Sequence, residues 1–146
     1  MNGVWFRYMM VLIALVLLIG SAPAGAQQPA VPAVSEHPDR LQLTDAVICE
    51  GVEEHIPINP AVVFSLNIGK VACYTFFDPV PISTHIFHNW YYRDRLSRRA
   101  KLSIRSPRWA TISSIQLREA DKGPWRVEIT DAAGRVLKIL RFSISD

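Results

Sequence analysis

From Leu41 onward, short runs of apolar, β-branched and aromatic residues alternate with clusters of turn-forming residues. This spacing is typical of strands in all-β domains. In the run at 125–130, Trp125, Val127 and Ile129 alternate with polar residues, which places them on one face of a strand. No stretch of helical length here carries apolar residues at the spacing of a helical face. The pattern predicts about seven strands, with 136–144 as an eighth or in place of the short second one: 44–52, 62–66, 71–77, 84–93, 96–104, 109–117 and 125–130.

Turns at these intervals favour one antiparallel β-sandwich over residues 44–146, with an immunoglobulin-like arrangement preferred over a small barrel. In the last run, the apolar set shifts from Leu137 and Ile139 to Leu140, Phe142 and Ile144. A shift of this kind predicts a β-bulge near Leu140.

The first 26 residues resemble a secretory signal peptide, with Arg7, then an apolar run, then the small-residue site Ala24-Gly25-Ala26. The run is shorter than the roughly 20 residues of a membrane-spanning helix, so we expect cleavage after Ala26. Residues 27–43, rich in proline and alanine, then form a linker. The protein is expected in the periplasm or outside the cell. The alternative is anchoring in the inner membrane by an uncleaved N-terminal segment.

The 146 residues are 49% hydrophobic and 20% charged, which suits one small domain with a core rather than a disordered chain. The two cysteines, Cys49 and Cys73, are an even number in an exported chain and predict one disulfide. A bond closing that loop would stabilise the fold by about 3 kcal/mol. The alternative is a pair of buried free thiols that pack as small core residues.

Several short motifs occur in an order and at spacings that resemble the bacterial domain-of-unknown-function family 2914. They are AVIC at 46–49, VACYTF at 71–76, HNWYY at 88–92, WATISS at 109–114 and GPWRVEI at 123–129. The resemblance extends over nearly everything after Thr44, although Ile112 stands where the family usually has a second tryptophan. It implies an extracytoplasmic β-sandwich domain without an established activity, and it supplies no catalytic residues.

Residues 85–92 are the stretch most suggestive of chemistry. His88, Trp90 and Tyr92 would share one face of a strand and, with Trp109, form an aromatic ledge that stacks on sugar rings or peptide. The alternative places Trp90 in the core, with His88 satisfied by backbone groups. His85 and His88 would lie on opposite faces, so no metal site is expected.

Charge is unevenly distributed along the chain after residue 26. Residues 27–80 hold two basic and seven acidic residues, whereas residues 81–146 hold thirteen basic and six acidic. The densest cluster comprises Arg93, Arg95, Arg98, Arg99, Lys101, Arg105 and Arg108. We expect much of it to line one outer strand face, where it would meet anionic lipid, an acidic polysaccharide or an envelope protein. Alternatively, it is a solvated edge strand whose arginines prevent aggregation. Export argues against nucleic acid as the partner.

Enzymatic motifs are not evident, because Ser113 and Ser114 lack a nucleophile elbow and the carboxylates form no acid–base pair. We therefore expect no catalysis, metal or cofactor. The sequence favours an exported non-catalytic β-sandwich module with a protein-interaction or structural role at the cell envelope. The alternative is a small carbohydrate-binding module that uses the aromatic ledge. The oligomeric state is left open.

Overall fold

The computed structural model describes residues 40–146, and all statements about structure concern this part of the chain. The predicted signal peptide and most of the predicted linker lie outside the described residues. The end of the linker already belongs to the folded unit, because the first strand begins at Leu43 and Leu41 packs against the core. None of the helices within residues 40–146 is long and apolar enough to cross a membrane.

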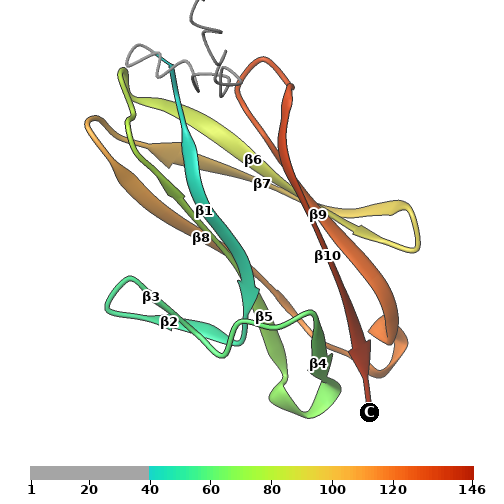
Figure 1. Ribbon diagram of the computed structural model, residues 1–146. Coiled ribbons are helices and arrows are strands. Elements are labelled where there is room, and N and C mark those ends of the chain that lie inside the picture. Colours follow the sequence, from blue (N-terminus) through green and yellow to red (C-terminus); the bar gives the residue numbers. More distant parts are fainter. Residues whose placement is uncertain (1–39) are drawn as a thin grey trace, which may run out of the picture. The chain divides into compact units, whose positions relative to one another are not determined.

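The described chain is all-β, as the alternating pattern predicted (Figure 1). A three-stranded antiparallel sheet has the order β1-β5-β8, and a five-stranded sheet has the order β4-β10-β9-β6-β7. Only the β4–β10 pair is parallel, and β2 and β3 form a separate hairpin. The strands are β1 (Leu43–Cys49), β2 (Gly51–Glu53), β3 (Ile56–Ile58), β4 (Val63–Ser65), β5 (Lys70–Phe77), β6 (Thr84–Tyr92), β7 (Arg95–Ile104), β8 (Trp109–Gln116), β9 (Gly123–Thr130) and β10 (Val136–Ser145).

One core cluster joins the two sheets. Val71 of β5 and Val127 of β9 are fully buried in it, together with Trp90 of β6. Trp125 packs face to face with Phe142, and Trp90 meets the edge of the same Phe142 ring, with ring centroids 6.1 Å apart in both pairs. The face predicted from the alternation of Trp125, Val127 and Ile129 is therefore the core face, as all three are buried.

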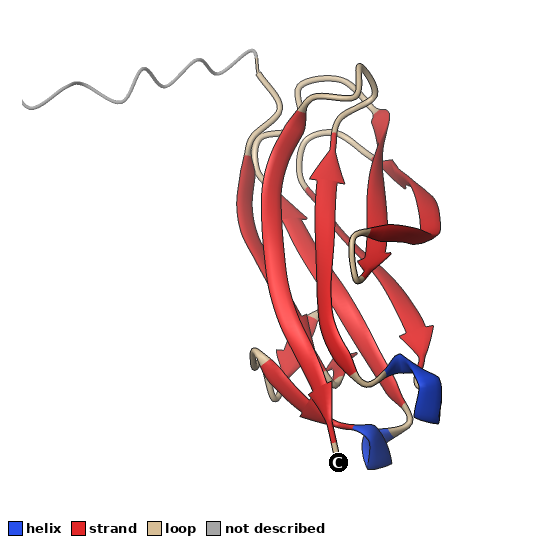
Figure 2. Cartoon of the chain, turned by 90° about the vertical axis from the view of Figure 1, so that its right-hand side faces the viewer, coloured by secondary structure: helices blue, strands red, loops and turns tan. Residues whose placement is uncertain are grey.

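The strand predictions match the observed bounds closely from β4 to β10. The predicted strand 44–52 is in fact two strands, since the chain bends at Glu50 and then turns back as the β2–β3 hairpin, whose second strand was not predicted. Two short 3₁₀ turns, Leu66–Ile68 and Glu119–Asp121, lie at the same end of the strands (Figure 2). The bulge predicted near Leu140 lies instead between Val136 and Lys138.

The β6–β7 connection is a two-residue turn formed by Arg93 and Asp94. Tyr92 pairs with Arg95, and the two residues between them have φ of 44° and 65°. Two successive left-handed residues give the turn whose twist matches that of the flanking strands. Arg93 was predicted to end a strand, so its position in the turn corrects that prediction.

Candidate functional site

Strand β6 places alternate side chains on the two faces of the five-stranded sheet. Ile86, His88 and Trp90 are fully buried on the inner face. Their neighbours Phe87 and Tyr91 lie on the outer face and remain partly exposed. His88 and Trp90 of the predicted ledge therefore lie on the face of this strand opposite to its exposed side chains.

A chain of polar side chains crosses the core at His88. The Trp90 indole N–H donates to Ser113 Oγ over 2.9 Å, and Ser113 Oγ lies 2.8 Å from His88 Nδ1. On the other side of the ring, His88 Nε2 lies 3.2 Å from Thr75 Oγ1, which donates to the Thr111 carbonyl oxygen over 3.4 Å. Because β5 and β8 belong to the other sheet, these bonds connect the two layers through the middle of the core.

One neutral form of the imidazole satisfies every hydrogen bond in this chain. Thr75 uses its proton on the Thr111 carbonyl, so it accepts from a protonated His88 Nε2. In this form Ser113 accepts from Trp90 and donates its own proton to the unprotonated His88 Nδ1. Burial lowers the pKa of His88 to about 4, in agreement with a neutral ring.

The aromatic ledge predicted from His88, Trp90, Tyr92 and Trp109 does not exist as a binding surface. His88 and Trp90 are fully buried, so the core alternative is the right one, except that side chains rather than backbone satisfy His88. The Tyr92 hydroxyl donates to the Lys122 carbonyl oxygen over 2.8 Å, and its ring lies 4.9 Å from that of Trp125. Trp109 packs against the core and carries the Arg105 guanidinium 5.2 Å from its ring centroid.

On the outer face of the five-stranded sheet, guanidinium groups lie over aromatic rings. The Arg99 guanidinium carbon is 3.9 Å from the Phe87 ring centroid, and that of Arg126 is 4.1 Å from the Tyr91 centroid. Lys101 is exposed and pairs in register with Phe87. We call Phe87, Tyr91, Arg99, Lys101 and Arg126 the arginine face. Alternation along the strand already separated Phe87 and Tyr91 from Trp90 in the sequence, because odd-numbered and even-numbered residues point to opposite faces. The sequence alone did not show which of the two sets was buried.

The predicted basic cluster is divided among several environments. Of the predicted cluster, Arg99 and Lys101 lie on the arginine face, and a register shift between Trp90 and Tyr91 pairs Arg95 with Tyr92 instead. Arg98 alternates with Arg99, so it pairs with the inward Trp90, and it donates to the Ser114 carbonyl oxygen of β8 over 2.9 Å. It bridges the open edges of the two sheets. The prediction that the cluster lines one strand face is accordingly wrong for most of its members.

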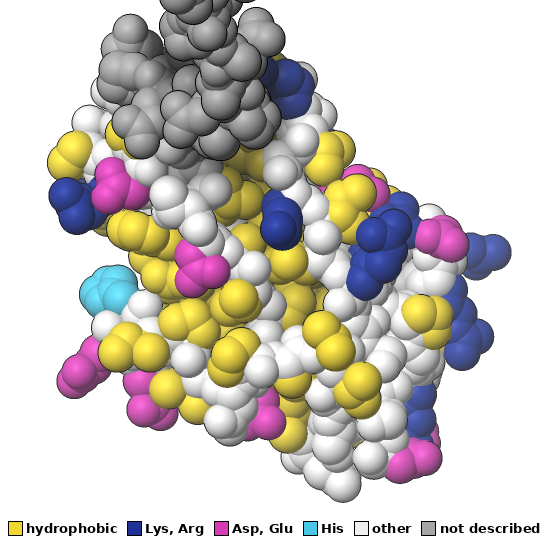
Figure 3. Space-filling view, in the orientation of Figure 1, with side chains coloured by type: hydrophobic (Ala, Val, Ile, Leu, Met, Phe, Trp, Pro, Cys, Tyr) yellow, Lys and Arg dark blue, Asp and Glu magenta, His cyan; other side chains and the backbone are white. Residues whose placement is uncertain are grey.

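The remaining members are placed near the ends of the strands. Arg95 begins β7 and is exposed. Arg93, in the turn, lies 5.1 Å from the Tyr92 ring centroid. Arg108 pairs with Asp78 at 3.6 Å. Figure 3 shows basic side chains gathered on the right of the view, the side of the β6–β7 hairpin, whereas hydrophobic side chains dominate the rest of this face.

The predicted Cys49–Cys73 disulfide is absent, and both cysteines are free and buried. Cys73 pairs in register with Ile48, and Cys49 pairs with Ala72, so their side chains point to opposite faces of the sheet. Cys73 lies in the core between the sheets, and Cys49 lies in a second cluster with Ala72 and Tyr74. A disulfide would need converging Cβ atoms, so the alternative of two buried thiols is the correct one. Burial raises the pKa of both thiols.

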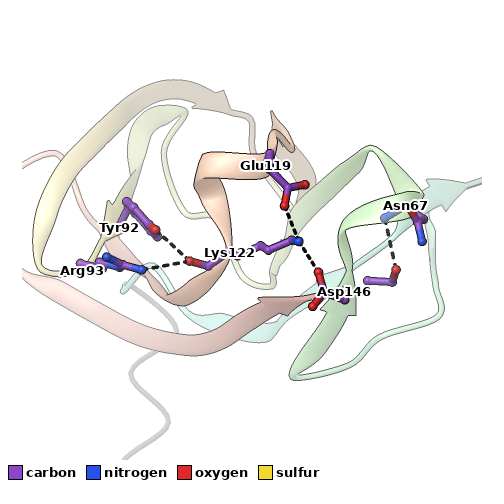
Figure 4. A network of polar contacts seen from close by, with 7 residues as sticks. Asn67, Tyr92, Arg93, Glu119, Lys122 and Asp146 are labelled. Atoms are coloured by element: carbon purple, nitrogen blue, oxygen red, sulfur yellow. Dashed lines mark hydrogen bonds and ion pairs between the residues drawn. The ribbon is translucent and has the colours of Figure 1, made fainter.

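Lys122 organises the end of the domain where the chain terminates (Figure 4). Its ammonium group pairs with Glu119 and with Asp146 of the C-terminus. Hydrogen bonds that Lys122 donates to the carboxylates of Asp146 and Glu119 raise its pKa. Its carbonyl oxygen accepts from Tyr92 and, over 3.5 Å, from Arg93. These contacts fasten the 3₁₀ turn at Glu119–Asp121 to the β6–β7 hairpin and to the end of β10.

Within residues 40–146, no group of three or more His, Cys, Asp or Glu side chains is arranged to hold a metal ion. Ser113 and His88 resemble a nucleophile and base in distance alone. His88 is fully enclosed in the core, and both partners are already used in the hydrogen-bond chain that begins at Trp90. Both side chains are buried in the core, where the arrangement stabilises the packing of the sheets.

The packed sheets, the buried polar chain and the arginine face define a small all-β module. Residues 83–144 match the family model described as "Protein of unknown function (DUF2914)". This match confirms the family resemblance that the motifs indicated. It spans β6 to β10, the part that contains the arginine face, and begins later than the motif resemblance at Thr44. Comparison with curated proteins found no match.

Proposed function

We propose that this chain is an exported, non-catalytic β-sandwich module, immunoglobulin-like in arrangement, that binds an anionic protein partner at the cell envelope through its arginine face. The observation that carries this proposal is the stacking of Arg99 on Phe87 and of Arg126 on Tyr91. The apolar N-terminal run with its small-residue site supports export.

Stacking prepares these cations for binding. A guanidinium group held over a ring has fewer conformations to lose when it contacts a carboxylate, and it is more weakly hydrated than an ammonium group. Arg126 is also held by Glu128 at 2.9 Å and by Asp94, so it serves mainly to position Tyr91. Arg99 and Lys101 form no ion pair within the described residues and are the groups available to a partner.

Side-chain composition favours a protein over a lipid or a polysaccharide as the partner. Protein interfaces are enriched in aromatic residues and arginine, and hot spots are often tyrosine or arginine. The arginine face combines both types on a rigid sheet. Carbohydrate binding through the predicted ledge is not supported, because His88 and Trp90 are inside the core.

The test is photo-crosslinking in the native host from position Ser103, an exposed residue of β7 close to the arginine face. We expect the parent chain to crosslink a protein with an acidic surface, and we expect the yield to fall as salt rises. The double variant Arg99→Ser/Lys101→Ser should lose the crosslink. The matched control Arg40→Ser/Lys70→Ser removes two exposed cations outside the face and should retain it. Equal yields from both variants, or crosslinks to lipid or glycan only, would refute the proposal.

A further inference from the structure

Within residues 40–146, the side of the domain between β1 and β10 has two sheet edges that lack a neighbouring strand along part of their length. Strand β1 is an edge of the three-stranded sheet, and β10 pairs with β4 only at Ser143, Ile144 and Ser145. Before Ser143, β10 pairs with β9 on one side alone. The short segment leading into β4 explains this, since it crosses from one edge to the other.

Two hydrogen bonds mark that crossing. The Ala61 N–H donates to the Ile48 carbonyl oxygen of β1 over 3.1 Å, and the Ser143 N–H donates to the Val62 carbonyl oxygen over 2.9 Å. The chain therefore leaves β1 at Ala61 and reaches β10 at Val62. It fills one end of the gap and leaves the rest of both edges uncovered.

A groove of about 320 Å³ lies at this place, with a mainly apolar lining. Its walls include Ala46 and Ile48 of β1, Ala61 and Val62 of the crossing segment, and Leu140 and Arg141 of β10. The Val62 side chain is 69% exposed. Figure 3 shows hydrophobic side chains in the middle of this face, where β1 and β10 lie in Figure 1.

The alternation of backbone groups along β10 shows which ones face the groove. Ser143 directs its N–H toward β4, away from β9. Alternate residues of a strand point their N–H and C=O groups to the same side, so Arg141 and Ile139 also present theirs to the uncovered edge. Such an edge is a template for one more strand.

We propose that the groove between β1 and β10 binds an extended segment of a partner protein, which adds to β10 as a strand in line with β4. The segment would be apolar at the positions facing Leu140 and Val62, and acidic at the alternate positions beside Arg141. Arg141 pairs in register with Arg126 of the arginine face, whereas Arg99 and Lys101 lie on β7, at the other side of the same sheet.

Charge selects this occupant over a second copy of the chain. Lys138 and Arg141 are exposed on β10 and form no ion pair within the described residues. Pairing β10 with β10 of a second copy would place like charges on adjacent strands, and like charges across strands destabilise the pair. An acidic strand would neutralise them. Cations on an edge commonly prevent self-association, which agrees with this selectivity.

The test uses the full chain and a capped ten-residue peptide of alternating valine and glutamate. We expect the peptide to bind and to slow hydrogen exchange at the amides of Ile139 and Arg141. The variant Ile139→Pro removes an outward N–H without breaking a bond to β9, and should weaken binding by about tenfold. The matched control Ile139→Ala keeps the N–H and should stay within about threefold of the parent.

Two more variants keep the result interpretable. Arg141→Glu should weaken binding of the valine–glutamate peptide and strengthen binding of a valine–lysine peptide. If Ile139→Pro does not fold, this reversal of peptide preference is the test of the proposed site. Arg99→Ser/Lys101→Ser should leave the affinity within about threefold, which separates this site from the arginine face. The proposal is overturned if the amides gain no protection, if only the arginine-face variant loses binding, or if the chain instead dimerises through β10.

Discussion

Acidification should destabilise the fold through His88. The ring is neutral and fully buried, and burial lowers its pKa to about 4, compared with 6.5 for an unperturbed histidine. Between those two pH values the unfolded chain binds a proton that the folded chain does not. Stability is therefore fully present above pH 6.5 and falls as the pH drops toward 4.

The size of the effect follows from the difference between the two pKa values. A shift of one unit corresponds to 1.36 kcal/mol, so the full difference amounts to about 3 kcal/mol, of which about 2 kcal/mol is lost between pH 7 and pH 5. The cause is burial, because the charged ring would lose its hydration in the core.

Urea denaturation followed by circular dichroism at pH 7, 6 and 5 measures the slope. The variant His88→Gln has no titrating group at this position, so its stability should depend much less on pH, whatever its stability at pH 7. Nitrogen NMR of the parent should show His88 as the Nε2–H form down to pH 5. A parent slope equal to that of His88→Gln would refute the reasoning.

Three further predictions concern the core. Ser113→Ala should cost about 1–3 kcal/mol in urea denaturation, because it leaves the Trp90 N–H and His88 Nδ1 without a partner; a loss below about 0.5 kcal/mol would contradict the hydrogen-bond chain. Non-reducing mass spectrometry after alkylation in denaturant should find two labelled thiols, Cys49 and Cys73, and little labelling of the folded chain; an intramolecular disulfide would contradict the opposite orientation of these side chains. Trp90→Ala should cost about 3–5 kcal/mol, because the ring is fully enclosed; a stable variant would show that this ring is not central to the core.

Local patterns in the sequence predicted much of the fold. Alternation within a single strand is a local signal, so the inward set Trp125, Val127 and Ile129 and most strand bounds could be derived without knowledge of the topology. The β3 strand was missed because its three residues include Pro57 and are too short to show a period. A bulge was expected near Leu140 but lies at the start of β10, because its position depends on pairing with β9, which no local pattern shows.

The candidate sites depended more strongly on register between strands. Cys49 and Cys73 seemed able to pair by count and compartment, yet their side chains point apart because Cys49 pairs with Ala72 rather than with Cys73. Similarly, one extra residue in β7 pairs Arg95 with Tyr92 and so removes Arg95 from the face of Arg99 and Lys101. A shift of one residue exchanges the faces of a strand, so non-local pairing decides which cations reach the surface.

Strand β6 shows how stability and binding can be separated within one element. Its even-numbered residues, such as His88, hold the two sheets together, whereas its odd-numbered residues, Phe87 and Tyr91, support cations on the outer face. The inner set is held by fixed hydrogen bonds and close packing and tolerates little change. The outer set contacts mainly its stacked partners, so substitutions there can alter the proposed binding surface at small cost to the fold. A loss of partner binding after a change in Arg99 with an unchanged melting curve would therefore report on the surface itself, whereas the same loss after a change at His88 would report on the core.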